Sequence, residues 1–147
     1  WFSVFFIFNL NYGRYLLVLF VLLVALTDIG GYLVGKKIGR HPLIPSVSPK
    51  KTWEGFFGGM GLTIIVISSI WILVPPHYKY YSFLYLMLIS VLTVLASVVG
   101  DLTVSMLKRE VGREDTGRLL PGHGGLLDRC DGIFGAAPIF TLCTFFA

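Results

Sequence analysis

Long apolar runs alternate with short polar segments along this chain. Three of these runs cover residues 15–35, 55–74 and 82–107. An α-helix of about 20 apolar residues is long enough to cross the hydrocarbon core of a bilayer. The pattern therefore predicts three membrane-spanning helices, joined by a polar segment at residues 36–54 and a short turn at residues 75–81.

The two ends of the chain carry shorter apolar runs. Residues 1–8 are too few to cross a bilayer, and residues 132–147 cross it only with help from the polar segment before them. No initiator Met and no basic segment precede the first run, which argues against a signal peptide. We therefore expect residue 1 to lie inside a membrane helix of a longer protein. The predicted fold is a single all-α domain, residues 1–147, forming a polytopic integral membrane helix bundle with about four to five transmembrane helices.

Composition and charge support this topology. Charged residues make up 14% of the chain, whereas soluble domains carry about 25%. The polar segments 36–54 and 108–131 carry five Lys or Arg each, and the turn at 75–81 carries one. Because Lys and Arg are enriched in cytoplasmic loops, both segments are predicted on the cytoplasmic face of the cell's inner or plasma membrane. A basic patch this small gives no reason to expect nucleic acid as a partner.

Two carboxylates fall inside predicted membrane helices. Asp28 precedes Lys36 by eight residues, or about 12 Å of helix. Asp101 precedes Lys108 by seven residues, or about 10 Å of helix. A charged group at such depth is costly and usually marks a functional or paired position. A structural hydrogen bond to a neighbouring helix is the alternative, but the matched depths favour one shared polar inlet.

The segment 108–131 has the composition of a phosphate site. Its glycines cluster around His123, and they can expose backbone N–H groups to a ligand. Asp128 and Asp131 are three residues apart, so both carboxylates point the same way on a helix or turn. Such a pair beside Lys and Arg suits Mg²⁺ bound with phosphate oxygens. A solvated connector between membrane helices is the alternative interpretation.

The segment 36–54 is a second candidate for phosphate binding. Its three prolines argue against a continuous helix. Lys50 and Lys51 precede the hydroxyl of Thr52 near a predicted helix start, where phosphate oxygens can be bound. The alternative is an ordinary basic loop of a membrane protein. The glycines that follow, at the start of the next helix, indicate close helix packing rather than ligand contact.

Two motifs in these segments resemble those of the phosphatidate cytidylyltransferases, also called CDP-diacylglycerol synthases. The first is S-P-K-K-T-W-E-G at residues 48–55, without a break. The second comprises Ser105, Lys108-Arg109, Asp115, Gly117, Leu120-Pro121, His123-Gly124-Gly125 and Asp128-Arg129-x-Asp131. The chain departs from the second motif at Glu114, where the family usually has Lys. Members of this family have additional N-terminal membrane helices, so the chain is similar to their C-terminal part.

The resemblance implies transfer of a cytidylyl group from CTP to phosphatidic acid, giving CDP-diacylglycerol and pyrophosphate. It implies Mg²⁺ or Mn²⁺ as cofactor, with a second cation as an open option. The expected partners are CTP, phosphatidic acid and the lipid bilayer, with a homodimer as a further option. Since the chemistry joins a lipid to a water-soluble nucleotide, the site is expected at the cytoplasmic face of the membrane.

The resemblance also implies roles for individual residues. The implied metal ligands are Asp101, Asp128 and Asp131. These three form the implied catalytic set together with Lys108 and His123, the latter as an acid/base or phosphate donor. The implied substrate-binding residues are Lys50, Lys51, Thr52, Glu54, Ser105, Arg109, Asp115, Gly124, Gly125, Arg129 and Asp28.

Two alternatives stay open at this point. The acceptor could be another membrane lipid phosphate or a prenol-type lipid, since no residue pattern in the sequence indicates recognition of acyl chains. The chain could also be a non-catalytic transporter or scaffold whose buried carboxylates conduct ions or lock helices. A shared site makes one geometric prediction, which is that Lys51 lies near Asp101 and Asp128 within reach of one bound triphosphate.

Overall fold

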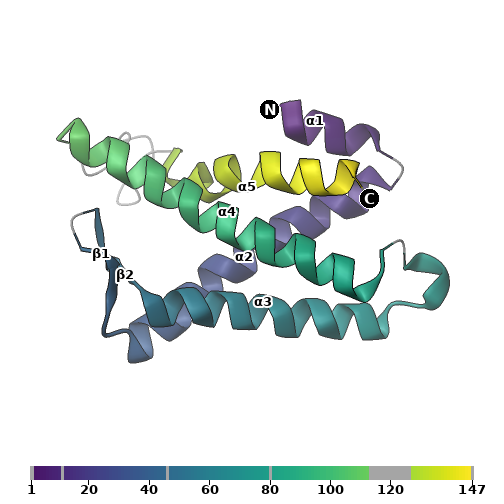
Figure 1. The fold of residues 1–147 in the computed structure, drawn as a ribbon, viewed down its shortest axis with the longest axis horizontal. Helices are drawn as coiled ribbons and strands as arrows, with labels where there is room; N and C mark the ends of the chain where they lie inside the picture. The colour runs from purple at the N-terminus through teal and green to yellow at the C-terminus, as the bar shows by residue number, and fades with distance from the viewer. Residues whose placement is uncertain (1, 11, 46, 80, 113–126, 147) are drawn as a thin grey trace.

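The computed structural model describes residues 2–10, 12–45, 47–79, 81–112 and 127–146. In chain order its elements are α1 (Phe2–Asn9), α2 (Gly13–Ile38), β1 (Pro42–Ile44), β2 (Ser48–Thr52), α3 (Trp53–Leu73), the 3₁₀ turn η1 (Pro76–Tyr78), α4 (Phe83–Glu110) and α5 (Leu127–Phe145). The long helices form a bundle with the β-hairpin at one end (Figure 1). The predicted all-α membrane bundle is confirmed.

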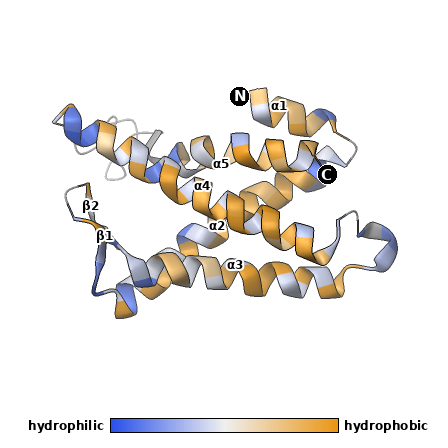
Figure 2. Ribbon diagram, viewed as in Figure 1, coloured by the Kyte–Doolittle hydropathy of each residue, from blue (hydrophilic) through white to orange (hydrophobic). Residues whose placement is uncertain are grey.

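Within the described residues, three helices are long and apolar enough to cross a membrane, namely α2, α3 and α4. The apolar part of α5, Cys130–Phe145, is shorter. Figure 2 shows apolar residues along the helices and polar residues gathered at the hairpin and at the C-terminal end of α4. The ends of α2 and α4 and the starts of α3 and α5 lie at this same end of the bundle (Figure 1). The chain is therefore an integral membrane protein, with its two longer polar segments at one end of the bundle and the short turn between α3 and α4 at the other.

The polar segment predicted at residues 36–54 has more regular structure than its prolines suggested. Helix α2 continues to Ile38, so that Lys36 and Lys37 lie in its last turn, where basic side chains interact favourably with the helix dipole. The hairpin follows, with Pro42 paired to Thr52 and Ile44 paired to Ser48. A two-stranded ribbon has only edge strands, which tolerate proline.

A set of hydrogen bonds fixes this hairpin to the start of α3. The Trp53 N–H donates to the carbonyl of His41 at 3.0 Å. The Glu54 carboxylate accepts the backbone N–H of His41 at 3.3 Å and lies 2.7 Å from its ring Nδ1. Thr52 caps α3, because its Oγ1 accepts the Gly55 N–H at 3.2 Å. The two hairpin strands and the start of α3 thus form one connected unit.

Close approach of α2 and α3 depends on glycine. A Cβ added at Gly30 would lie 2.7 Å from the Gly59 Cα, and one added at Gly59 would lie 2.6 Å from the Thr27 carbonyl oxygen. A Cβ at Gly61 would meet no atom within 4 Å. The predicted packing role is confirmed for Gly59. Small residues at a membrane helix interface allow backbones to approach in this way.

The apolar core joins α2 to α5. The buried rings of Phe20 and Phe140 have their centroids 5.2 Å apart. Helices α4 and α5 also approach closely, since a Cβ at Gly100 would lie 2.7 Å from the Gly135 Cα. Buried hydroxyls such as Thr63 donate to the carbonyl four residues earlier in their own helix, which satisfies them in an apolar setting.

We predict that Gly59→Ala destabilises the protein whereas Gly61→Ala does not. The new methyl group at position 59 forces α2 and α3 apart, at a cost of about 1–3 kcal/mol. At position 61 it meets no neighbour and gains helix propensity of about 0.5–1 kcal/mol. Thermal unfolding of the full-length protein in detergent measures both variants. Equal melting temperatures for the two would contradict the glycine contact.

We also predict that Glu54→Ala loosens the hairpin. Losing the hydrogen bonds to His41 costs about 1 kcal/mol locally, so amide exchange across residues 39–53 should accelerate about fivefold. Hydrogen exchange with mass spectrometry measures this, and Glu110→Ala, at the exposed end of α4, is the matched control. Unchanged exchange in the Glu54 variant would show that other contacts hold the hairpin.

Candidate active site

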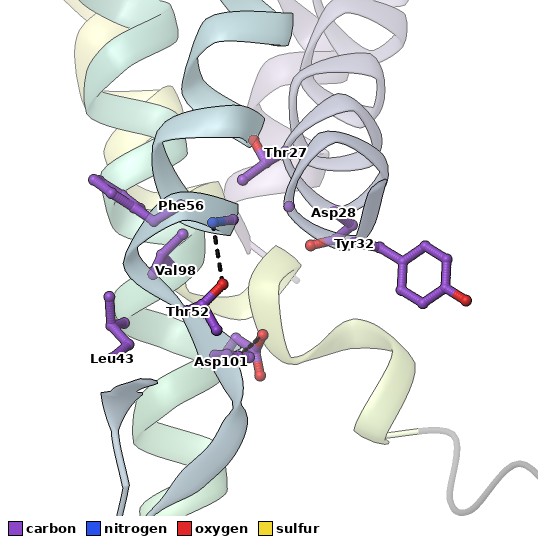
Figure 3. Close-up of a pocket in the computed structure, with 11 residues that line it drawn as sticks. Thr27, Asp28, Tyr32, Leu43, Thr52, Phe56, Val98 and Asp101 are labelled. Carbon is purple, nitrogen blue, oxygen red and sulfur yellow. Dashed lines mark hydrogen bonds and ion pairs between the residues drawn. The ribbon is translucent and has the colours of Figure 1, made fainter. Parts of the chain in front are cut away.

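A cavity of about 250 Å³ lies at the polar end of the bundle, between the hairpin and helices α2, α3 and α4 (Figure 3). Its walls combine apolar and charged side chains from segments far apart in the sequence. The lining residues are Thr27, Asp28, Gly31, Tyr32, Leu43, Lys51, Thr52, Gly55, Phe56, Val98 and Asp101. The two carboxylates predicted at matching depth, Asp28 and Asp101, therefore line one cavity.

The central interaction in the cavity is an ion pair between Lys51 of β2 and Asp101 of α4. The Lys51 Nζ is shielded from solvent. The predicted proximity of these two residues is confirmed. Burial lowers the pKa of Lys51 from its ordinary value, although the carboxylates of Asp131 and Asp28 oppose this shift. A buried ammonium group of this kind requires nearby negative charge to remain protonated.

Charged groups from four elements interact around Lys51. Asp28 of α2 and Asp131 of α5 are close enough to each other and to Lys51 to interact electrostatically, and Lys108 of α4 repels Lys51. Asp131 also accepts the backbone N–H of Gly132 at 2.8 Å. The described part of the site thus brings together the carboxylates of two membrane helices, a hairpin lysine and the start of α5.

The start of α3 borders the same cavity. Thr52, Gly55 and Phe56 all line it, and Figure 3 shows the hydrogen bond from the Gly55 N–H to Thr52. The N-terminal end of a helix carries partial positive charge, which favours anions. This helix start and Lys51 together give the cavity two features suited to phosphate oxygens.

Some predicted site residues have other partners. The Glu54 carboxylate binds His41, and Glu54 is not among the lining residues. Arg109 donates from Nε to the Val47 carbonyl at 3.3 Å, which connects the end of α4 to the hairpin turn. Ser105 lies one turn beyond Asp101 on α4 and is half-buried. In this structure Glu54 and Arg109 support the hairpin that carries Lys51.

Several predicted residues cannot be placed in the site. His123, Asp115, Gly124 and Gly125 lie outside the described residues. Lys50 belongs to β2, and Asp128 and Arg129 belong to the first turn of α5. The structure does not describe the side chains of these last three residues.

A divalent cation would find suitable ligand chemistry here. Carboxylate oxygens are the ligands that Mg²⁺ prefers. Asp101 pairs with Lys51, and Asp28 and Asp131 interact with Lys51 electrostatically. Among the described side chains, no three His, Cys, Asp or Glu lie close enough together to hold a metal ion. Asp128 is not one of those side chains.

The structure shows a contributor that the sequence did not indicate. His41 holds Glu54 through two of its atoms. A single histidine in a basic segment carries no distinguishing signal, because its partner lies 13 residues away and becomes adjacent only when the hairpin forms.

The chain is similar in sequence to a known protein family. The model of the cytidylyltransferase family matches residues 1–147. A phosphatidate cytidylyltransferase of Mycobacterium bovis is 45% identical over 116 residues, covering 78% of this chain and 36% of the relative. One of Haemophilus influenzae is 41% identical over 141 residues, covering 92% of this chain and 47% of the relative.

A third relative carries no assigned activity in its name. It is the uncharacterized protein YnbB of Escherichia coli, 44% identical over 129 residues, with 87% of this chain and 42% of the relative covered. The chain spans less than half the length of each of these relatives. The family match extends over the whole chain, and the chain belongs to the cytidylyltransferase family.

Proposed function

We propose that the full-length protein is a phosphatidate cytidylyltransferase, which converts CTP and phosphatidic acid into CDP-diacylglycerol and pyrophosphate. The observation that carries the proposal is the cavity in which Lys51 and Asp101 form an ion pair beside Asp28 and Asp131. Membership of the cytidylyltransferase family and the names of the relatives support it.

The reaction accounts for the mixture of charges. An oxygen of the lipid phosphate attacks the α-phosphorus of CTP. The bond between the α-phosphorus and the oxygen that bridges it to the β-phosphorus breaks, and pyrophosphate leaves. A phosphomonoester is largely ionised near neutral pH, so the nucleophile needs no strong general base. Negative charge builds up on the phosphates, and fixed positive groups in a desolvated site stabilise it. When bound, Mg²⁺ or Mn²⁺ neutralises part of this charge.

The residues divide into two proposed roles. Asp101, Asp128 and Asp131 hold the divalent cation, and Asp28 is placed to help with a second cation or with substrate. The phosphates of CTP bind Lys51, the Thr52 hydroxyl and the N-terminal end of α3, supported by Lys108. Without substrate, Lys51 and Asp101 neutralise each other. With substrate, each exchanges this partner for a phosphate or a cation.

The site faces the cytoplasm in this proposal. Among the described basic residues, those of α2's last turn, the hairpin and the end of α4 lie at the cavity end. Arg14 and Lys79 belong to the opposite end of the bundle. This asymmetry agrees with the positive-inside rule, and CTP is a cytoplasmic nucleotide that would enter from that side.

We predict that Lys51→Met lowers cytidylyl transfer at least 100-fold. The variant loses the positive charge that the proposal assigns to the phosphates of CTP, and removing one group that stabilises developing negative charge typically costs about 10²–10³ in rate. Incorporation of radiolabelled CTP into the lipid phase, with full-length protein and phosphatidic acid micelles, measures the rate. Lys37→Met, an exposed lysine outside the cavity lining, should retain normal activity. Equal losses for the two variants would indicate a general effect of charge.

We predict that Asp128→Asn abolishes transfer and leaves membrane insertion intact. The amide keeps the size of the side chain but binds a divalent cation poorly. The same assay, run over a range of Mg²⁺ concentrations, measures the loss, and Glu110→Gln is the matched control at an exposed position. Normal turnover of the Asp128 variant at saturating Mg²⁺ would eliminate it as a metal ligand.

A further inference from the structure

Helix α2 carries a polar stripe on a surface that is otherwise apolar. Asp28, Tyr32 and Lys36 are four residues apart, hence on one face of the helix, and all three are exposed in the described chain. Ile29 and Leu33, next to them in sequence, are exposed apolar residues, as expected where a helix faces lipid. Polar groups on such a face require an explanation.

The stripe coincides with an opening of the cavity. Asp28 and Tyr32 line the cavity, and both residues are exposed to solvent. Figure 3 shows the Tyr32 ring directed away from Asp101 and the hairpin. Asp28 and Tyr32 thus join the cavity to the polar stripe, and a lateral opening beside them would admit a substrate that diffuses within the membrane.

Lys36 is held at the edge of this opening. Its Nζ donates to the Tyr32 hydroxyl at 3.1 Å and lies 5.3 Å from the centroid of the Tyr32 ring. Lys36 belongs to the last turn of α2, where a lysine can extend its ammonium group to the level of lipid headgroups. Its exposed position contrasts with that of Lys51, whose Nζ is shielded and paired with Asp101.

We propose that Lys36 and the Tyr32 hydroxyl bind the phosphomonoester of the lipid substrate as it enters the cavity from the bilayer. This inference rests on the proposed function and assigns to its lipid substrate a subsite separate from the cations at Lys51. A phosphomonoester carries a charge of about −1.5 to −2, which a lysine at the membrane surface attracts, and a hydroxyl adds a directional hydrogen bond. The acyl chains remain in the bilayer against the apolar face that includes Ile29 and Leu33.

Steady-state kinetics of the full-length protein in mixed micelles tests the assignment. The fraction of phosphatidic acid is varied at saturating CTP, and CTP is then varied at saturating lipid. We expect Lys36→Met to raise the KM for phosphatidic acid roughly tenfold, in line with loss of one charge-assisted hydrogen bond, and to leave the KM for CTP unchanged. Tyr32→Phe should raise the lipid KM less, and Lys36→Arg should restore most of the affinity.

Lys37→Met is the matched control, because Lys37 is also exposed and has the same charge in the same helical turn. It should leave both KM values unchanged. Equal increases of the lipid KM in the two methionine variants would show that Lys36 acts only through general surface charge, and would overturn the proposal. A rise in the KM for CTP in the Lys36 variant would assign it to the nucleotide and overturn the proposal equally.

A second measurement is independent of catalysis. In the full-length protein, phosphatidylcholine vesicles that contain phosphatidic acid should protect Lys36 from an amine-reactive reagent, as read by mass spectrometry. The same vesicles with diacylglycerol in place of phosphatidic acid, or inorganic phosphate, should not. A Lys36 that is unreactive before lipid is added would show that another segment covers the stripe, and the proposal would fail. Absence of transfer by the unmodified protein would refute the proposed function, while the protection result would still decide the lipid subsite.

Discussion

The structure depends on the pairing of charges inside an apolar bundle. An ammonium group taken out of water loses several kcal/mol of hydration free energy unless opposite charge compensates it. Lys51 is shielded at its Nζ and meets Asp101, and the same requirement keeps Asp28 and Asp131 nearby. Four elements that are separate in sequence must therefore meet at one end of the bundle. The charges that the proposed reaction would use are therefore also charges that the packing of these elements must bring together.

Glycine packing makes this meeting geometrically possible. A Cβ at Gly35 would lie 3.1 Å from the Thr52 Oγ1, and one at Gly55 would lie 2.8 Å from the Gly31 carbonyl oxygen. Larger residues at these positions would move the start of α3 and strand β2 away from α2. Asp28 would then no longer share a cavity with Thr52 and Lys51. The small residues at this interface thus determine the width of the cavity as well as the packing of the helices.

The sequence predicted the parts of this molecule that depend on local composition. Hydropathy identified α2, α3 and α4, and the Lys and Arg content of the polar segments placed both of them at one face. The structure pairs Lys51 and Asp101 at that end. The hairpin was not predicted, because its stability comes from pairing across residues 42–52 and from the contact between His41 and Glu54. The motif at residues 48–55 includes Glu54 among the implied substrate-binding residues. It does not indicate that the Glu54 carboxylate contacts His41, because that contact forms only when the chain folds.

A reaction between a lipid and a nucleotide requires two kinds of positive charge. Phosphates of a soluble nucleotide can be transferred into a desolvated cavity, where a shielded lysine such as Lys51 interacts strongly with them because the local dielectric constant is low. A lipid phosphate arrives along the membrane surface, and its first partner must be exposed, as the Lys36 side chain is. In the proposed reaction, the difference in burial between Lys36 and Lys51 separates capture of the lipid from activation of the nucleotide.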